Sequence, residues 1–339
     1  MFNKIVRILL KMVVGLLIAI ILIGVFSYRK DLSREALESD YFLTSSHYLA
    51  VEIDDLDGNP VTIDVHFLDQ GEVDDPVVVL LHGAFSSSHT FIDWMELLVA
   101  SDWRVIAIDL PNHGLTGNFS DNVVSQRRSA AVVKEVIDDL DITSCVIGGN
   151  SMGGGVAWEF ASEFHGIEGF SVNGLVLIDA VYPDMGSGAP ESFETIRKLP
   201  VLVDILSKMT PRPLLKSILK GVYGSESTID DLTVDRYYDL LRMDGHREAL
   251  IMAQQEASIE TALSPLERLE RIKNAAIPVL VLWGLEDSWI SVDYAFRFQT
   301  LLNLPDTSVL IYTGLGHVPM EENPSDTGAD LLAFLHTME

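Results

Sequence analysis

The sequence has little cysteine and little positive charge. Its 339 residues include one cysteine, Cys145, and a single cysteine excludes a disulfide framework within the chain. Only 23 lysines and arginines stand against 50 aspartates and glutamates, so the formal net charge is −27. A nucleic-acid binder needs a basic face, which makes nucleic acid an unsuitable ligand for this chain. The sequence also lacks internal repeats, low-complexity tracts and any cluster with metal-ligand spacing.

Apolar residues, in contrast, make up 48% of the chain. A fraction that high can offset the chain entropy lost on folding, which excludes intrinsic disorder as the main state. A chain of this length is expected to form one large domain or two smaller ones. The acidic surface favours solubility and repels anionic lipid headgroups and polyanionic substrates.

The first 30 residues contain no acidic side chain and one long apolar run. Met12–Ser27 is 16 residues without a charge, which gives about 24 Å of helix at ~1.5 Å per residue. This is slightly shorter than a bilayer core of about 30 Å, but Lys11 and Arg29 can snorkel to the two interfaces. We therefore expect residues 1–30 to anchor the chain in a membrane. A cleaved signal peptide is the alternative, although only a weak cleavage site, Val25-Phe26-Ser27, follows the run.

The flanking charges predict an orientation for this anchor. Lys4, Arg7, Lys11 and the terminal amine precede the apolar run, whereas only Arg29 and Lys30 follow it closely. This bias favours an N-terminus in the cytoplasm and a large domain outside it. Cleavage of the segment would instead give a secreted or periplasmic protein.

After a linker at residues 31–47, strand-like and helix-like segments alternate. Val77–Leu81 is a short, continuous apolar run, as expected of a strand buried on both faces. The expected strands are Tyr48–Ile53, Val61–Leu68, Val77–Leu81, Arg104–Asp109, Ser144–Gly148, Gly174–Ile178, Pro278–Trp283 and Thr307–Tyr312. The expected helices between and after them are Phe91–Ala100, Val123–Leu140, Met152–Phe164, Val292–Leu302 and Ser325–Met338. The alternation predicts an α/β domain with a mainly parallel sheet and helices on both faces.

The alternation is interrupted at residues 184–272, which divides the α/β core into residues 48–183 and 273–339. This stretch contains no strand-like run and four helix-like ones: Ser192–Lys208, Pro213–Val222, Val234–Asp244 and Arg247–Ser258. We interpret it as a helical cap over the ligand-binding edge of the sheet. The alternative is an independently folded helical domain with no part in the site.

The segment Gly149-Asn150-Ser151-Met152-Gly153 joins an expected strand to an expected helix. In this context the G-x-S-x-G pattern predicts a nucleophile elbow, a sharp turn that exposes the serine hydroxyl above the sheet. The two glycines are needed because a β-carbon at either position would clash within the turn. We expect Ser151 to be a nucleophile and the backbone N–H of Met152 to face a developing oxyanion.

A serine nucleophile needs a general base. His317 lies in the glycine-flanked loop after the last expected strand, and such loops gather catalytic groups at the carboxyl edge of an α/β sheet. His82, His89 and His113 also lie in loops or at a helix start, where a histidine more often makes structural hydrogen bonds. His317 is therefore the predicted base.

The imidazole in turn needs an acid that orients and stabilises it. Asp287 follows the strand Pro278–Trp283 and is the predicted acid. Its neighbour Glu286 and the aspartate that ends another strand, Asp179, are the alternatives.

The second oxyanion donor is expected in the loop His82–Ser88, after the strand Val77–Leu81. Gly83 permits an unusual backbone conformation there, so the N–H of Ala84 can face that of Met152. Phe85 is the alternative donor and is also a candidate for lining the substrate pocket. Trp289 and Val318, beside the predicted acid and base, are further candidates for the pocket wall.

Taken together, the motifs resemble those of the α/β-hydrolase fold-1 superfamily, over roughly residues 48–338. The segments that carry the resemblance are His82-Gly83, Asp109-Leu110-Pro111-Asn112-His113-Gly114, Gly149-Asn150-Ser151-Met152-Gly153, Trp283-Gly284-Leu285-Glu286-Asp287 and Gly316-His317. The order serine, aspartate, histidine is that of the superfamily. The resemblance implies an α/β-hydrolase fold, with a mostly parallel, eight-stranded sheet flanked by helices. Asn112 departs from the superfamily, where glycine is common.

The stretches Thr210–Gly224 and Tyr237–Ala249 resemble the helical lid of haloalkane dehalogenases, epoxide hydrolases and carbon–carbon bond hydrolases. The first two of these use an aspartate at the elbow, so Ser151 argues against both activities. The resemblance implies hydrolysis of small to medium lipophilic carboxylic esters through an acyl-enzyme, with no metal or organic cofactor. Carbon–carbon bond hydrolysis of diketones is the main alternative. Perhydrolase, acyltransferase or peptidase activity and a non-enzymatic binding role are weaker alternatives.

Overall fold

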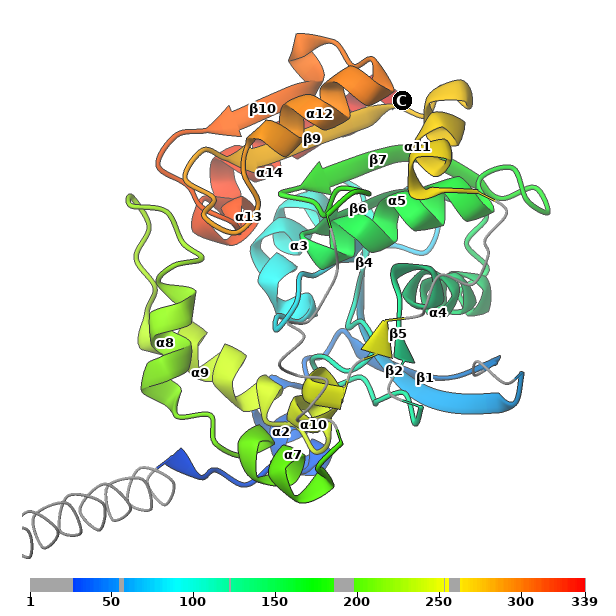
Figure 1. The fold of residues 1–339 in the computed structure, drawn as a ribbon. Coiled ribbons are helices and arrows are strands. Elements are labelled where there is room, and N and C mark those ends of the chain that lie inside the picture. The colour runs from blue at the N-terminus through cyan, green and yellow to red at the C-terminus, as the bar shows by residue number, and fades with distance from the viewer. Residues whose placement is uncertain are drawn as a thin grey trace, which may run out of the picture.

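An eight-stranded sheet forms the centre of the computed structural model, which describes residues 27–54, 58–121, 123–185, 198–252, 254–255 and 263–338. The strand order is β1-β2-β4-β3-β6-β7-β9-β10 (Figure 1). All neighbours from β4 to β10 pair in parallel, whereas β2 pairs antiparallel with both β1 and β4. The strands are β1 (Ser46–Asp54), β2 (Pro60–Gln70), β3 (Val77–Leu81), β4 (Arg104–Ile108), β6 (Ser144–Asn150), β7 (Ser171–Ile178), β9 (Val279–Gly284) and β10 (Val309–Tyr312). All eight predicted strands are thus present.

Helices cover both faces of this sheet, which is why the central strands are apolar throughout. Every residue of β3, β4 and β9 is buried. One face packs on helices α4 (Gln126–Asp139), α5 (Met152–Phe164), α11 (Pro265–Asn274) and α12 (Asp293–Leu302). The other face packs on α3 (Ile92–Val99), which follows the short 3-10 helix η1 (Ser88–Phe91), and on α14 (Pro324–Leu335), which follows α13 (Pro319–Glu322).

Four helices between β7 and β9 lie to one side of this core, and we call them the cap helices (Figure 1). They are α7 (Pro200–Ser207), α8 (Arg212–Leu219), α9 (Asp231–Leu241) and α10 (His246–Met252). A small cluster of buried residues, including Leu215, Leu219 and Tyr237, joins α8 to α9. Helix α11 begins within the predicted cap range but packs against α5 of the core, where Arg268 pairs with Glu159.

Two short elements differ from the sequence-based expectation. The predicted helix Val123–Leu140 is wrong at its start, because Val123–Val124 form strand β5 and the helix begins at Gln126. Strand β5 pairs in parallel with β8 (Gln254–Gln255), which lies in a range predicted to be free of strands. Ser125 explains the late helix start, because its hydroxyl caps α4 by accepting a hydrogen bond from the N–H of Arg128.

The predicted linker at residues 31–47 is also structured. It contains helix α2 (Arg34–Tyr41), which begins after the capping residue Ser33. Leu37 of this helix is buried against Leu240 and Met243 of the cap. The predicted anchor Met12–Ser27 lies outside the described residues except for Ser27, and within the described part of the chain no helix is long and apolar enough to cross a bilayer.

Candidate active site

Ser151 lies between the end of β6 and the start of α5, in a backbone conformation that few side chains tolerate. Its φ is +53° and its ψ is −117°. The turn is tight: a β-carbon at Gly149 would lie 2.2 Å from the carbonyl oxygen of Gly153, and one at Gly153 would lie 2.2 Å from that of Leu81. Only glycine fits at these two positions, as the sequence pattern predicts.

Neighbouring backbone holds this turn in place. The N–H of Ser151 donates to the carbonyl of Ile178 (2.9 Å), and its carbonyl accepts from the N–H of Val181 (3.0 Å). The side-chain amide of the buried residue Asn150 donates to the carbonyl of His317 (2.8 Å). The serine turn is thereby connected both to β7 and to the loop that carries the histidine. These contacts offset the strain at Ser151, which would not persist in a free peptide.

His317 and Asp287 are hydrogen bonded to each other. His317 Nδ1 lies 2.7 Å from Asp287 Oδ2, and both side chains are buried. The other carboxylate oxygen, Oδ1, accepts from the N–H groups of Trp289 (2.7 Å) and Ile290 (3.0 Å). Because the carboxylate engages Nδ1, the proton belongs on that nitrogen and Nε2 is left free to accept one. The indole of Trp289 stacks on the imidazole, with ring centroids 5.8 Å apart.

Glu322 of α13 fixes the loop that carries His317, a role that the sequence did not reveal. Its carboxylate accepts from the N–H groups of Gly316 (2.9 Å) and of Gly224 (2.7 Å), which follows the cap helix α8. It also accepts from the hydroxyl of Ser227. A glutamate five residues after a candidate base gives no recognisable pattern on its own, because both Gly224 and Ser227 are distant in sequence.

Ser151 and His317 line one cavity of about 490 Å³, together with Ala84, Phe85, Trp289 and Val318. The structure therefore brings all these predicted site residues to one place. Met152 is the exception: it is not among the residues that line this cavity, and its side chain packs against the core at the start of α5. Among the hydrogen bonds of the described residues there is none between the Ser151 hydroxyl and His317.

The loop after β3 passes directly beside the nucleophile. A β-carbon at Gly83 would lie 2.7 Å from Asn150 Oδ1 and 3.1 Å from the β-carbon of Ser151. Phe85 has a φ of +64°, a conformation that is rare for a bulky residue and often marks a functional constraint. The N–H of Ser88 donates to the buried carboxylate of Asp109 (2.6 Å), which fixes the far end of the loop.

The family model of the alpha/beta hydrolase family matches residues 78–331. The chain belongs to this family. It is 26% identical over 266 residues to a 2-hydroxy-6-oxononadienedioate/2-hydroxy-6-oxononatrienedioate hydrolase of Cupriavidus pinatubonensis, covering 76% of this chain and 86% of the relative.

Two solved structures illustrate the likeness of fold. One is a bacterial membrane phospholipase A, with a TM-score of 0.65, 21% identity and coverage of 100% of this chain and 99% of that one. The other is a thermophilic esterase from Thermogutta terrifontis, with a TM-score of 0.62, 21% identity and coverage of 86% and 99%. The family and its hydrolase relatives identify the protein as a hydrolytic enzyme, which confirms the resemblance found in the sequence.

The two alternative acids of this alpha/beta hydrolase differ from Asp287 in their contacts. Glu286 is exposed and accepts hydrogen bonds from the N–H and hydroxyl of Ser225. Asp179 is fully buried and accepts from the N–H of Gly284 (3.0 Å). Burial, together with the negative charge of Asp287, raises the pKa of Asp179 well above its usual range. This raised pKa favours the neutral acid form, which suits a partner of His317 less well than a carboxylate does.

Among the described residues, the oxygen and nitrogen donors of Asp179, Asp287 and His317 form one close group, all within 4.8 Å of one another. This is a donor set of the type that binds metals. These side chains already form hydrogen bonds with each other and with the backbone. Asp287 bonds His317 and the N–H groups of Trp289 and Ile290, and Asp179 bonds the N–H of Gly284.

The alternative bases, His82, His89 and His113, make hydrogen bonds that have a structural role. His82 is fully buried; its Nδ1 donates to the carbonyl of Gly83, and its Nε2 accepts from the N–H of Leu110. His113 donates to the carbonyl of Pro111, and His89 bonds the carbonyl of Tyr41. Burial lowers the pKa of all three, so they are held neutral within the core of the hydrolase.

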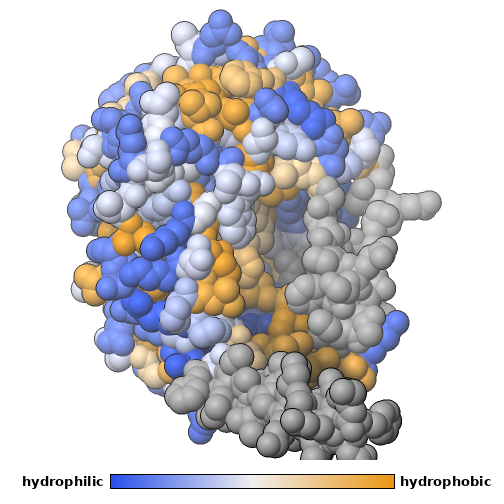
Figure 2. Space-filling view, turned by 60° about the vertical axis from the view of Figure 1, so that its left-hand side comes forward, coloured by the Kyte–Doolittle hydropathy of each residue, from blue (hydrophilic) through white to orange (hydrophobic). Residues whose placement is uncertain are grey.

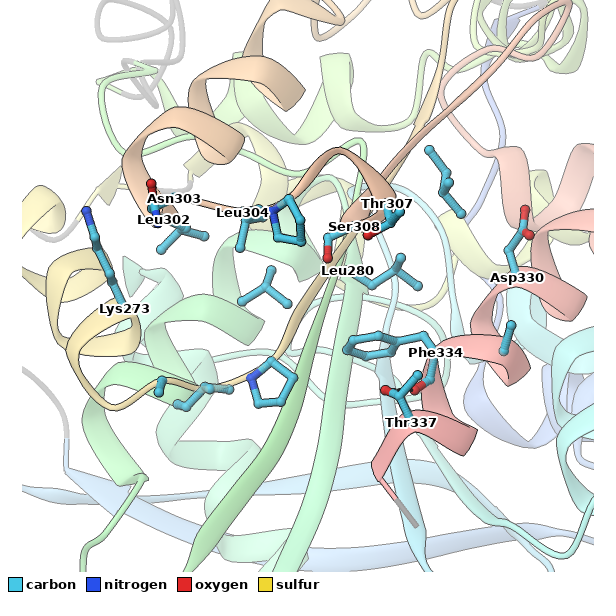
Figure 3. A pocket seen from close by; sticks show the side chains of 17 residues that line it. Lys273, Leu280, Leu302, Asn303, Leu304, Thr307, Ser308, Asp330, Phe334 and Thr337 are labelled. Atoms are coloured by element: carbon cyan, nitrogen blue, oxygen red, sulfur yellow. Dashed lines mark hydrogen bonds between the residues drawn. The ribbon is translucent and has the colours of Figure 1, made fainter.

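A second cavity, of about 570 Å³, lies at the opposite edge of the sheet (Figure 3). Its walls include the start of β9 at Leu280 and the residues before β10, Thr307 and Ser308, whereas Ser151 follows the carboxyl end of β6. The ionisable side chains drawn around it, Lys273 and Asp330, come from different helices and point apart. The cavity that contains Ser151 is therefore the candidate active site.

Proposed function

We propose that this hydrolase cleaves carboxylic esters of small to medium lipophilic substrates through an acyl-enzyme on Ser151. The observation that carries the proposal is the His317–Asp287 hydrogen bond of 2.7 Å beside a strained serine in the same cavity. This is the arrangement that activates a serine hydroxyl for attack on a carbonyl carbon.

The mechanism follows from the positions of these groups. His317 Nε2 takes the proton from Ser151 as the serine oxygen attacks the ester carbonyl. The backbone N–H groups of Ala84 and Met152 stabilise the negative oxygen of the tetrahedral intermediate. The protonated imidazole, stabilised by Asp287, then gives its proton to the departing alcohol. Water attacks the acyl-enzyme in the reverse sense and releases the acid.

The cavity wall supports a lipophilic substrate. Apart from the catalytic edge, most of its lining comes from apolar side chains of the cap and its flanking loops: Leu206, Leu215, Ile218, Leu219, Val222, Leu241, Leu250 and Ile251. Apolar residues also gather around a hollow on the face that brings α8 forward (Figure 2). Such a wall binds an alkyl chain by removing its surface from water.

Carbon–carbon bond hydrolysis is the second candidate, and the curated relative favours it. That relative is named for substrates that carry two carboxylate groups. Among the described residues that line the present cavity, Arg247 alone has a fixed positive charge, and Asp31 already neutralises it. A dianionic substrate would therefore lack a matching pair of cations, which is why ester hydrolysis is our first choice.

The first test is hydrolysis of p-nitrophenyl esters of increasing acyl length by the full chain in detergent. We expect turnover that Ser151→Ala reduces to background, while Ser101→Ala, at the end of α3 on the far side of the core, leaves it unchanged. The acyl length that gives the highest turnover would indicate how long an acyl chain the cavity accommodates. A folded parent that cleaves a vinylogous diketone and no ester would overturn the proposal in favour of carbon–carbon hydrolysis.

We also propose that residues 1–30 tether the enzyme to a membrane with its catalytic domain outside the cytoplasm. The uncharged run Met12–Ser27 and the preceding basic residues support this location. Recovery of the intact N-terminus in the membrane fraction, with the domain accessible to external protease, is the expected result. A mature N-terminus near Ser27 in the soluble fraction would show cleavage instead.

A further inference from the structure

One wall of the active-site cavity contains a buried cation whose hydrogen bonds are incomplete. Arg247 of the cap helix α10 is 4% exposed and lines the same cavity as Ser151 and His317. Its Nη1 is buried and has no hydrogen-bond partner among the residues that the structure describes. Buried N–H groups in folded proteins are almost always paired, so an unpaired guanidinium nitrogen beside a substrate cavity needs an explanation.

The remaining atoms of this guanidinium are fully engaged. Nε donates to Oδ1 of Asp31 (3.1 Å), and Nη2 donates to the same oxygen and to the carbonyl of Arg29 (2.7 Å). These contacts fix the plane of the guanidinium group. They come from the segment that precedes α2 and leave Nη1 as the guanidinium nitrogen without a hydrogen-bond partner among the described residues.

Other polar cap side chains that line the cavity, those of Ser207, Thr210 and Tyr237, are already paired. The hydroxyl of Tyr237 donates to Glu321 (2.8 Å). Ser207 and Thr210 donate to backbone carbonyls of the cap. Around them the wall is apolar, and an apolar surrounding strengthens any hydrogen bond made within it. Among the described cap residues that line the cavity, Arg247 is thus the one with an unpaired buried donor nitrogen.

The charge of Arg247 decides what kind of ligand group suits it. Asp31 already balances the positive charge, and the chain as a whole carries −27. The site therefore lacks a hydrogen-bond acceptor and not a counter-charge. A neutral oxygen satisfies Nη1 without placing a third charge beside the Arg247–Asp31 pair.

We propose that Arg247 Nη1 binds a second, neutral oxygen of the substrate, remote from the carbonyl that Ser151 attacks. The substrate class is then esters that carry another ester or hydroxyl group, such as diesters or partly acylated polyols. This inference rests on the proposed ester hydrolysis and narrows it. Arg247 acts here in binding and selectivity and takes no part in the proton transfers.

The test compares substrates that differ in the second oxygen. The full chain is given diethyl esters of diacids with four to ten carbons, the corresponding ethyl monoesters, and the monoethyl hemiesters, which are anionic. We expect kcat/KM for the best diester to exceed that for the matching monoester by about tenfold, the value of one hydrogen bond to a charged donor. The anionic hemiester is expected to be no better than the monoester.

Three variants assign the preference to Arg247. Arg247→Lys keeps a charge that can pair with Asp31 but has no nitrogen equivalent to Nη1, and Arg247→Gln removes the charge. Both should lower kcat/KM for the diester about tenfold more than kcat/KM for the matching monoester, so that the diester preference is lost. Arg242→Gln is the matched control, because Arg242 also donates to this segment, at the carbonyl of Lys30, but does not line the cavity. It should keep the preference.

Binding measurements separate failure of this inference from failure of the proposed function. Calorimetric titration of Ser151→Ala and of Ser151→Ala/Arg247→Lys with the diester should give a tighter complex for the first. If the parent cleaves no ester but this difference in binding persists, the proposal of ester hydrolysis is refuted, whereas the proposal that Arg247 binds a substrate oxygen is retained. Equal kcat/KM and equal affinity for diester and monoester, or a higher kcat/KM for the hemiester, would overturn the inference.

Discussion

The serine turn and the cap helices border the same cavity, but different forces hold them. The turn is fixed by backbone: Gly149 and Gly153 leave no room for side chains, and the N–H and carbonyl of Ser151 bond the end of β7 and the residues after it. The cap is held to the rest of the chain in part by charged side chains, such as Arg236 on Glu321 and Arg247 on Asp31. The position of Ser151 therefore depends on backbone geometry, whereas the position of the substrate wall depends on side chains that a point mutation can remove.

The largest effect is expected within the catalytic group of the core. Asp287→Asn should lower kcat by about 10⁴-fold, because the amide cannot stabilise the imidazolium and favours the wrong tautomer. Asp179→Asn is the matched control: burial raises the pKa of Asp179 and favours its neutral form, and asparagine has the same shape, so activity should stay within about threefold. The measurement is kcat of both variants and of the parent in steady-state hydrolysis of an ester. An equal loss in both variants would contradict the assignment of Asp287 as the acid.

The next largest effect is on stability: a side chain added in the serine turn should lower the free energy of unfolding much more than one added in the cap. Gly153→Ala would place a β-carbon 2.2 Å from the carbonyl oxygen of Leu81, and we expect the free energy of unfolding to fall by about 4 kcal/mol. Gly221→Ala, just after α8, meets only the carbonyl of Ile218 at 3.3 Å. It should change stability by less than about 0.5 kcal/mol. Urea unfolding monitored by fluorescence measures both, and similar values would refute the comparison.

A smaller effect is expected where the cap attaches to the catalytic loop. Arg236 of α9 forms a largely buried ion pair with Glu321 of α13. Arg236→Gln leaves Glu321 without its cation and should cost about 3 kcal/mol, with faster proteolysis in the cap helices. Arg212→Gln, whose partners Asp231 and Asp235 are exposed, should cost less than about 1 kcal/mol. A cap that is cleaved no faster in Arg236→Gln than in the parent would contradict this role.

The smallest effect concerns pH. Burial lowers the pKa of His113 to about 3, so the folded chain keeps this imidazole neutral while the unfolded chain protonates it below about pH 6.5. Its contribution is therefore complete above that pH and is lost as the pH falls toward 3. Urea midpoints at pH 7.5, 6.5 and 5.5 should fall with acid, and His113→Leu should weaken that dependence. Replacing the exposed His336 with leucine should not.

The sequence predicts the parts of this structure that depend on local patterns. Strand Val77–Leu81 and helix Met152–Phe164 have the predicted bounds, because a buried strand and a helix that starts at a sharp turn both have clear local signals. Asn112, the departure from the superfamily motif, has a φ of +66°. Asparagine is among the few residues other than glycine that tolerate this region, so the motif's turn is preserved.

Other features depend on contacts between distant segments, which no local pattern reveals. Val123–Val124 continue a helical pattern, yet they pair with Gln254–Gln255, about 130 residues away. Residues 31–47 read as a polar linker, but Leu37 finds its apolar partners only in the folded cap. Glu322 and Arg247 belong to this class too: each is an ordinary charged residue until the fold places it beside the cavity.

The segment before α2 changes the mechanics of the cap. A helical insertion is normally joined to its core by two chain crossings, about which it can swing. Here residues 29–32 also run along the cap: the N–H of Arg29 bonds the carbonyl of Lys208 after α7, that of Leu32 bonds the carbonyl of Arg242 after α9, and Asp31 pairs with Arg247. These contacts brace the cap in addition to the ion pair between Arg236 and Glu321. A truncated chain that begins after Leu32 would lose the brace while keeping every catalytic group.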